Sequence, residues 1–210
     1  MELKVRIKIC GITNLEDALL AVELGASALG FVFYPKSPRY IAPEAARRII
    51  QHLPPFVTTV GVFVNEREEA ILKVVGEAGL DLVQLHGEES PELCVRLFPK
   101  VIKALRVREV EDLKVITAYQ GKIRAVLLDT YVKGIPGGTG QTFNWDLARR
   151  AQKFGLPLVL AGGLRPENIK EALRTVRPFA VDVSSGVETF PGKKDPEKLR
   201  ALFTAVYSST

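Results

Sequence analysis

The sequence predicts one α/β domain folded as a closed (β/α)8 barrel, the TIM-barrel fold, and two observations lead to it. Short β-branched and apolar runs alternate with longer segments of helical periodicity, which is the pattern of a parallel sheet with crossover helices. Eight such strand-then-helix units fit into 210 residues, and this barrel needs about 200 to 250. No Ser-, Pro- or Gly-rich linker divides the chain, so residues 1–210 are predicted to be a single domain. An open doubly wound sheet is the alternative architecture.

Each unit begins with a strand rich in Val, Ile and Leu. The predicted strands are Val5–Cys10, Leu29–Phe33, Thr58–Phe63, Leu82–Leu85, Val101–Leu105, Ala125–Asp129, Leu158–Ala161 and Ala180–Val183. The helical segments that follow them are Leu15–Leu24, Pro43–Leu53, Glu66–Ala78, Pro91–Phe98, Val110–Tyr119, Trp145–Phe154, Asn168–Val176 and Pro196–Tyr207. Pro43 and Pro196 lie near helix starts, where a missing N–H costs nothing, and Gly25, Gly79 and Gly155 follow helix ends.

Charge and cysteine content narrow the class of protein. The 29 Lys and Arg exceed the 24 Asp and Glu and give a net charge of +5, but they are scattered through amphipathic segments. This distribution argues against nucleic-acid binding and suits a small anionic ligand. Cys10 and Cys94 are far apart and lack metal-ligand spacing, so we expect no disulfide framework, no metal site and a cytoplasmic location. Charges at residues 2–6, and no apolar run near about 18 residues, predict neither export nor membrane insertion.

Reactive side chains and small residues occur where the predicted strands end, which is the active face of a (β/α)8 barrel. Cys10 ends the first strand, His86 follows the fourth, and Asp129 ends the sixth. The last two strands are followed by small residues: Gly162 and Gly163, then Ser184, Ser185 and Gly186. A helix that begins at such residues presents unpaired backbone N–H groups to a phosphate. This division of side chains and phosphate loops is typical of phosphosugar enzymes.

Five segments carry a resemblance to a known family. They are Lys8-Ile9-Cys10-Gly11-Ile12-Thr13, Gly30 to Tyr40, Gln84-Leu85-His86-Gly87, Gly137-Gly138-Thr139-Gly140 and Val181 to Glu188. Taken together, in this order and spacing over residues 8–195, they resemble the phosphoribosylanthranilate isomerases of tryptophan biosynthesis. The resemblance implies an enzyme without a cofactor. Its reaction would be the Amadori rearrangement of N-(5-phosphoribosyl)anthranilate, a small phosphosugar, to 1-(2-carboxyphenylamino)-1-deoxyribulose 5-phosphate.

That reaction requires one acid and one base, because the ribose ring oxygen must gain a proton and the sugar C2 must lose one. The resemblance implies that Asp129 is the acid and Cys10 the base. Their ordinary pKa values, about 3.9 for Asp and about 8.5 for Cys, suit neither role at neutral pH, so the surroundings must shift at least one.

Lys8 is a candidate source of such a shift. It shares a strand face with Cys10, about 6.6 Å away along the chain, and we expect its ammonium group to favour the thiolate. In a closed barrel the eighth strand lies beside the first, so we also expect a contact between Lys8 and Asp182. Asp182 is then either catalytic support, which we prefer, or an interior carboxylate with a satisfied partner.

Other residues are assigned to substrate binding. The resemblance places Arg39 at the anthranilate carboxylate, which a guanidinium binds in a two-pronged geometry, with Lys36 as the alternative. His86 either orients the substrate or makes a structural hydrogen bond. The glycine-rich segment 131–142 is expected to fold over the ligand and to add Gly140 to the phosphate site. Residues 192–195 are predicted to form a surface turn.

Two other classes of function remain open at this stage. Another phosphosugar enzyme would keep the phosphate loops but need a different acid and base, and a non-catalytic phosphosugar-binding protein would need neither. An isomerase with this phosphate site can also accept the related aminoimidazole phosphoribosyl substrate. The segment Pro54-Pro55-Phe56 and the apolar faces are compatible with a homodimer without requiring one.

Overall fold

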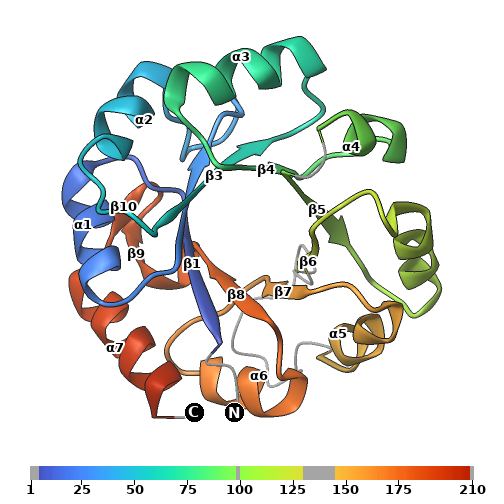
Figure 1. Ribbon diagram of the computed structural model, residues 1–210. Helices are drawn as coiled ribbons and strands as arrows, with labels where there is room; N and C mark the ends of the chain where they lie inside the picture. Colours follow the sequence, from blue (N-terminus) through green and yellow to red (C-terminus); the bar gives the residue numbers. More distant parts are fainter. Residues whose placement is uncertain (1–4, 98–99, 130–144, 209–210) are drawn as a thin grey trace.

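The computed structural model describes residues 5–97, 100–129 and 145–208, which form a closed barrel of parallel strands (Figure 1). The barrel strands are β1 (Arg6–Cys10), β2 (Ala28–Val32), β3 (Thr58–Phe63), β4 (Leu82–Leu85), β5 (Val101–Arg106), β6 (Ala125–Asp129), β7 (Leu158–Ala161) and β8 (Ala180–Val183). Each strand pairs with the next along the chain, and β8 pairs with β1. The prediction of a closed barrel is therefore confirmed, and the open sheet is excluded.

Helices surround the barrel (Figure 1). They are α1 (Leu15–Glu23), α2 (Pro43–Ile50), α3 (Glu68–Ala78), α4 (Pro91–Leu97), α5 (Trp145–Ala151), α6 (Ile169–Val176) and α7 (Pro196–Tyr207), with 3₁₀ helices η1 (Glu111–Tyr119), η2 (Gln152–Phe154) and η3 (Ser185–Val187). The predicted helix over residues 110–119 is thus a 3₁₀ helix, and that over residues 145–154 divides into α5 and η2. The sequence patterns missed a hairpin after β8, formed by the antiparallel strands β9 (Glu188–Phe190) and β10 (Lys193–Lys194).

The strands separate an outer core from the barrel interior because successive side chains point to opposite faces. The larger core packs the strands against the helices and includes Ile7 and Ile9 of β1. A smaller core fills the interior of the barrel: Val60, Ile102, Ala104, Ala125, Leu127, Val159, Ala161 and Ala180. Lys8 and Cys10 alternate with the two isoleucines, so they face the interior.

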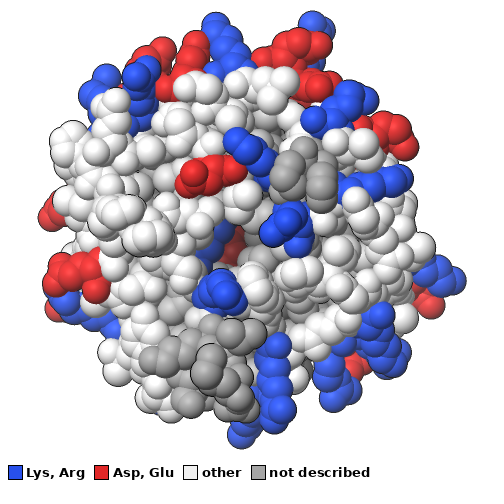
Figure 2. All heavy atoms as spheres, viewed as in Figure 1, with Lys and Arg blue, Asp and Glu red and all other residues white. Residues whose placement is uncertain are grey.

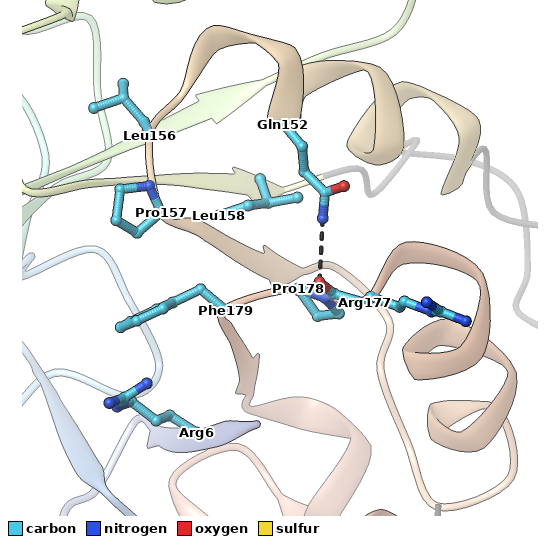
Figure 3. Close-up of a pocket in the computed structure, with 8 residues that line it drawn as sticks. All are labelled: Arg6, Gln152, Leu156, Pro157, Leu158, Arg177, Pro178 and Phe179. Atoms are coloured by element: carbon cyan, nitrogen blue, oxygen red, sulfur yellow. Dashed lines mark hydrogen bonds between the residues drawn. The ribbon is translucent and has the colours of Figure 1, made fainter. Parts of the chain in front are cut away.

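A pocket of about 330 Å³ lies at the end of the barrel where β1, β7 and β8 begin (Figure 3). Its lining consists of Arg6, Gln152, Leu156, Pro157, Leu158, Arg177, Pro178 and Phe179. The Arg6 guanidinium lies 4.4 Å from the centroid of the Phe179 ring, and Nε2 of Gln152 donates to the carbonyl oxygen of Arg177 at 3.2 Å. This end is opposite to the mouth at which Cys10 and Asp129 end their strands.

In the face seen in Figure 2, charged side chains lie around the rim, where acidic groups interrupt the basic ones, and a few basic side chains lie near the centre. No continuous basic stripe crosses that face, in agreement with the scattered charges of the sequence. In the part of the chain that the structure describes, no helix combines the length and the apolar character needed to span a membrane.

Candidate active site

Three predicted side chains lie at the carboxyl ends of barrel strands. Cys10 is the last residue of β1, His86 directly follows β4, and Asp129 is the last residue of β6. His86 Nε2 lies 3.3 Å from Oδ2 of Asp129, and its Nδ1 lies 3.0 Å from Nε2 of Gln84. The side-chain amide of Gln84 is the donor, so Nδ1 of His86 is the acceptor. In the neutral imidazole the proton is then on Nε2, which is directed at Asp129. Gln84 thus orients a pair that stays partly exposed, at 20% for His86 and 24% for Asp129.

Cys10 is buried beside a glycine of the neighbouring strand. Its Cα is in register with that of Gly30. A Cβ on Gly30 would come within 2.7 Å of Cys10 Sγ and 3.1 Å of Lys8 Cε. Both contacts are closer than real Cβ atoms tolerate with ease, so a side chain at position 30 would displace Cys10, Lys8 or both. Gly30 therefore makes room for the candidate base.

The predicted interior contact between Lys8 and Asp182 is confirmed. The two residues are in register between β1 and β8, Nζ lies 2.8 Å from Oδ1, and the side chains are only 5% and 9% exposed. Burial alone would lower the pKa of Lys8, but Asp182 and Cys10 together raise it above its ordinary value. Lys8 is therefore an ammonium ion on the same interior face as Cys10.

Lys8 favours the Cys10 thiolate as expected, but the net shift of the Cys10 pKa is upward. Burial raises the pKa of the Cys10 thiol, and Asp182 adds to the rise. Lys8 and Lys194 both lower that pKa, as expected for nearby cations, but they do not outweigh the loss of water around the sulfur. The interior that brings Lys8 close to the thiol also desolvates the thiolate.

Changing Lys8 to methionine is expected to raise the pKa of Cys10 further, because Lys8 makes the largest contribution that lowers it. A general base acts only after losing its proton, so its activity rises with pH through its pKa. The rising limb of kcat/KM should move to higher pH, together with the thiol titration measured by ultraviolet absorbance. The double variant Lys8→Met/Asp182→Asn, which leaves no unpaired buried charge, is the control for folding. Unchanged titration in the folded single variant would contradict this role.

The two loops predicted to hold phosphate touch each other at the same end of the barrel. Gly162 and Gly163 follow β7 with φ angles of 88° and 64°, a left-handed conformation that favours glycine. Ser184 follows β8, and Ser185 and Gly186 begin η3. A Cβ on Gly186 would overlap the carbonyl oxygen of Leu164, so a larger residue there would displace the main chain as well as any phosphate. Gly140, the remaining predicted phosphate residue, lies outside the described residues, as does the segment 131–142.

Arg39 reaches the mouth from the segment between β2 and α2. Its guanidinium is bound side-on by Glu188: Nε lies 2.9 Å from Oε1 and 3.1 Å from Oε2, and Nη2 lies 2.5 Å from Oε2. The hydrogen bonds to Glu188 raise the pKa of Arg39, and Arg39 and Lys194 hold that of Glu188 below its usual range despite burial. Lys36, the alternative to Arg39, is exposed. Glu188 ends one of the segments that carry the family resemblance, but the sequence analysis assigned it no role.

The prediction that residues 192–195 form a surface turn is wrong for Lys194, which is only 1% exposed. Its Nζ donates to the carbonyl oxygen of Cys10 at 2.6 Å and to Oε1 of Glu188 at 2.8 Å. Burial lowers the pKa of Lys194, while Glu188 opposes that change. The alternation of the β9–β10 hairpin turns Lys194 inward, while Lys193 stays near the surface and pairs with Asp17 at 2.7 Å.

A third buried ion pair supports the turn that carries His86. Lys103 Nζ lies 2.9 Å from Oε2 of Glu89, with side chains 1% and 2% exposed. The ammonium also donates to the carbonyl oxygen of Gly87 at 2.8 Å, and Glu89 accepts from the N–H of Gly87 at 2.9 Å. This pair fixes the main chain just after His86. Among the described residues, no three His, Cys, Asp or Glu side chains are grouped to hold a metal ion.

Known proteins match the chain over almost its whole length. Residues 7–205 match the family model described as N-(5′-phosphoribosyl)anthranilate (PRA) isomerase. The N-(5′-phosphoribosyl)anthranilate isomerase of Citrifermentans bemidjiense is 57% identical over 197 residues, which cover 94% of each chain. That of Geobacter sulfurreducens is 55% identical over 196 residues, covering 93% of this chain and 95% of the relative.

Solved structures agree with these matches. The crystal structure of phosphoribosyl anthranilate isomerase from Thermotoga maritima superposes with a TM-score of 0.90 at 53% identity, covering 97% of this chain and 99% of the other. A phosphoribosyl anthranilate isomerase crystallised with reduced 1-(o-carboxyphenylamino)-1-deoxyribulose 5-phosphate superposes with a TM-score of 0.87 at 51% identity, with the same coverage. The chain therefore belongs to the N-(5′-phosphoribosyl)anthranilate isomerase family, a family of isomerases that interconvert an aldose and a ketose.

Proposed function

We propose that this chain catalyses the rearrangement of N-(5′-phosphoribosyl)anthranilate to 1-(2-carboxyphenylamino)-1-deoxyribulose 5-phosphate in tryptophan biosynthesis, without a cofactor. One observation carries the proposal beyond family membership. A buried thiol, a carboxylate oriented by an imidazole, a guanidinium and two glycine- and serine-containing loops all lie at the carboxyl ends of the strands. These are the groups that an acid, a base, a carboxylate site and a phosphate site require. The relative crystallised with the reduced product supports the same ligand chemistry.

Asp129 is the proposed acid. It donates a proton to the ribose ring oxygen while the lone pair of the anilino nitrogen forms a C1=N bond. The bond between C1 and the ring oxygen breaks, and the ring opens to an iminium ion. His86 lies 3.3 Å from this carboxylate and orients it toward the sugar. Asp182 supports the site indirectly, through Lys8, rather than as a second acid.

Cys10 is the proposed base. Its thiolate removes the C2 proton, and the electron pair of the C2–H bond forms C1=C2 and neutralises the iminium nitrogen. The resulting enolamine becomes the ketone when C1 gains a proton and the C2 hydroxyl loses one. The iminium ion adds a positive charge near the sulfur to those of Lys8 and Lys194, and it favours the thiolate at the step that needs it.

Substrate binding is assigned to groups away from the reacting carbons. The phosphate binds to the loops at residues 162–163 and 184–186 through backbone N–H groups, as phosphates do at the starts of helices. Arg39 binds the anthranilate carboxylate. Binding energy from these two ends fixes C1 and C2 between the acid and the base.

The test is to incubate the purified protein with N-(5′-phosphoribosyl)anthranilate and to identify the product by mass spectrometry. We expect complete conversion to the deoxyribulose phosphate. Binding without conversion would show a phosphosugar-binding protein instead. Conversion of only the aminoimidazole phosphoribosyl substrate, assayed in parallel, would show another isomerase on the same barrel.

We further propose that the protein works in the cytoplasm as a homodimer. Its two described cysteines are free, as expected in a reducing compartment. One structural relative, from Thermotoga maritima, is named as a monomeric form of a dimeric phosphoribosylanthranilate isomerase, at 50% identity and a TM-score of 0.86. In this chain Phe56 precedes β3 at the amino-terminal end of the barrel, fully exposed and with a left-handed φ of 72°. The pocket of Figure 3 opens at that same end. The exposed apolar ring of Phe56 is therefore suited to insert into a second copy of the chain.

Changing Phe56 to aspartate is expected to convert the dimer to a monomer, because a carboxylate would have to be buried in the interface. Sedimentation equilibrium or light scattering measures the change in mass. Val95→Asp, an equally polar change at an exposed position on α4, is the matched control and should stay dimeric. A dimer that survives Phe56→Asp would exclude this interface.

A further inference from the structure

The carboxylate of Glu188 lies at the centre of a buried ionic cluster that touches three parts of the mouth. It accepts from Arg39 Nε and Nη2, from Lys194 Nζ at 2.8 Å, and from the N–H of Gly192 at 3.3 Å. The side chain of Glu188 is 4% exposed, and that of Arg39 is 22% exposed. Glu188 is thus fixed on its inner side, and Arg39 lies between it and the open mouth.

The geometry leaves one edge of the guanidinium for a ligand. Arginine has five N–H donors, and Glu188 engages those on Nε and one of the two on Nη2. Nη1 makes no hydrogen bond to any residue that the structure describes. The Nη1–Nη2 edge has the parallel pair of donors that a second carboxylate accepts in two-pronged fashion.

Charge in the cluster favours an anion at that edge. Glu188 carries one negative charge, and the ammonium group of Lys194 matches it at 2.8 Å. The positive charge of Arg39 therefore remains available to a ligand. A role for Glu188 as a competitor for the ligand's carboxylate fits less well, because Lys194 and Gly192 hold it in place.

The cluster also fixes Arg39 relative to the candidate base. Lys194 Nζ donates to the carbonyl oxygen of Cys10 at 2.6 Å, which ties the cluster to the end of β1. A Cβ on the next residue, Gly11, would lie 2.6 Å from Cδ of Arg39 and 3.2 Å from Oγ of Ser184. The arginine therefore runs along the Gly11 main chain, beside both the thiol and the proposed phosphate loop.

We propose that Glu188 is a positioning residue for substrate recognition: it holds Arg39 side-on through Nε and Nη2, so that the Nη1–Nη2 edge meets the anthranilate carboxylate. This inference rests on the proposed function, in which Arg39 binds that carboxylate. Holding the long arginine side chain in advance removes the entropy that it would otherwise lose on binding. Glu188 acts through Arg39 and does not touch the substrate.

The experiment compares two ligands by isothermal titration calorimetry. One is reduced 1-(2-carboxyphenylamino)-1-deoxyribulose 5-phosphate, and the other is the same compound without the ring carboxylate. Glu188→Gln should weaken binding of the first roughly tenfold or more and change binding of the second less than about twofold. Arg39→Lys should likewise weaken binding of the ligand that has the ring carboxylate and leave binding of the other almost unchanged. The double variant should be no weaker than Arg39→Lys, because Glu188 acts only through Arg39. In turnover, Glu188→Gln should raise KM more than it lowers kcat.

Lys198→Met is the matched control. Lys198 donates to the main-chain oxygen of Glu188 at 2.8 Å but does not bind its carboxylate, so the variant should bind both ligands like the wild type. If Glu188→Gln does not fold, Glu188→Asp keeps the charge but is too short to reach Arg39 and Lys194 together, and should show the same selective loss.

Three results would overturn the proposal. Equal weakening of both ligands by Glu188→Gln would mean that the residue only supports the hairpin. Tighter binding of the carboxylated ligand would mean that Glu188 competes for Arg39. Selective weakening of the carboxylated ligand by Glu188→Gln but not by Arg39→Lys would mean that the carboxylate binds elsewhere. This result would reject the assignment of Arg39 in the proposed function as well.

Discussion

Changing Cys10 to serine is expected to lower kcat by roughly 100- to 10,000-fold, the usual contribution of a general base. Serine has nearly the same size, but its hydroxyl does not ionise in the pH range where the enzyme is folded. Cys10 is buried and packs against Gly30, Lys8, Val32 and Val62, so the substitution should leave the site's shape intact. Affinity for the reduced product should therefore change little while turnover is lost.

Cys94 offers the matched control for this variant. It is also fully buried, but it lies on α4, outside the barrel, and burial raises the pKa of its thiol to about 11. Cys94→Ser should lower the melting temperature without lowering kcat, because it buries a hydroxyl in a packed core. Loss of kcat in Cys94→Ser, or its retention in Cys10→Ser, would remove Cys10 from the mechanism.

Changing Asp129 to asparagine is expected to lower kcat by a similar factor, because an amide cannot donate the proton that the ring oxygen must receive. The side-chain oxygen of asparagine can still accept from Nε2 of His86, which now lies 3.3 Å from Oδ2 of Asp129. The pair should therefore keep its geometry, and the reduced product should still bind. Steady-state kinetics with the natural substrate gives kcat, and calorimetry gives the affinity. A kcat within a few-fold of the wild-type value would show that the ring opens without Asp129.

The fold and the strand-end residues were predictable because they depend on local patterns. Alternating strands and helices in sufficient number define the barrel, and a closed barrel places β8 beside β1. The Lys8–Asp182 contact follows from that neighbour relation and from the two-residue alternation of side chains. Cys10, His86 and Asp129 lie at strand ends, so their common location at the mouth also follows.

The missed features depend on contacts between distant residues. Glu188 and Lys194 lie in a short polar segment with glycine and proline, whose composition is that of a surface turn. Only the tertiary structure shows that the hairpin folds inward and meets Arg39, which precedes Glu188 by 149 residues. The net rise of the Cys10 pKa was missed for a related reason. Spacing along a strand reveals the cation at Lys8 but not the extent to which the fold removes water from the thiol.

The mechanism that we propose for the barrel mouth isomerises phosphoribosylanthranilate with Cys10 as base and Asp129 as acid. To test it, the decay of substrate fluorescence is measured with the wild type, Cys10→Ser and Asp129→Asn under identical conditions. The affinity of each protein for the reduced product is measured in parallel. We expect rapid decay with the wild type and decay at least about 100-fold slower with each variant, with affinities preserved. Decay at the wild-type rate in either variant would contradict this mechanism.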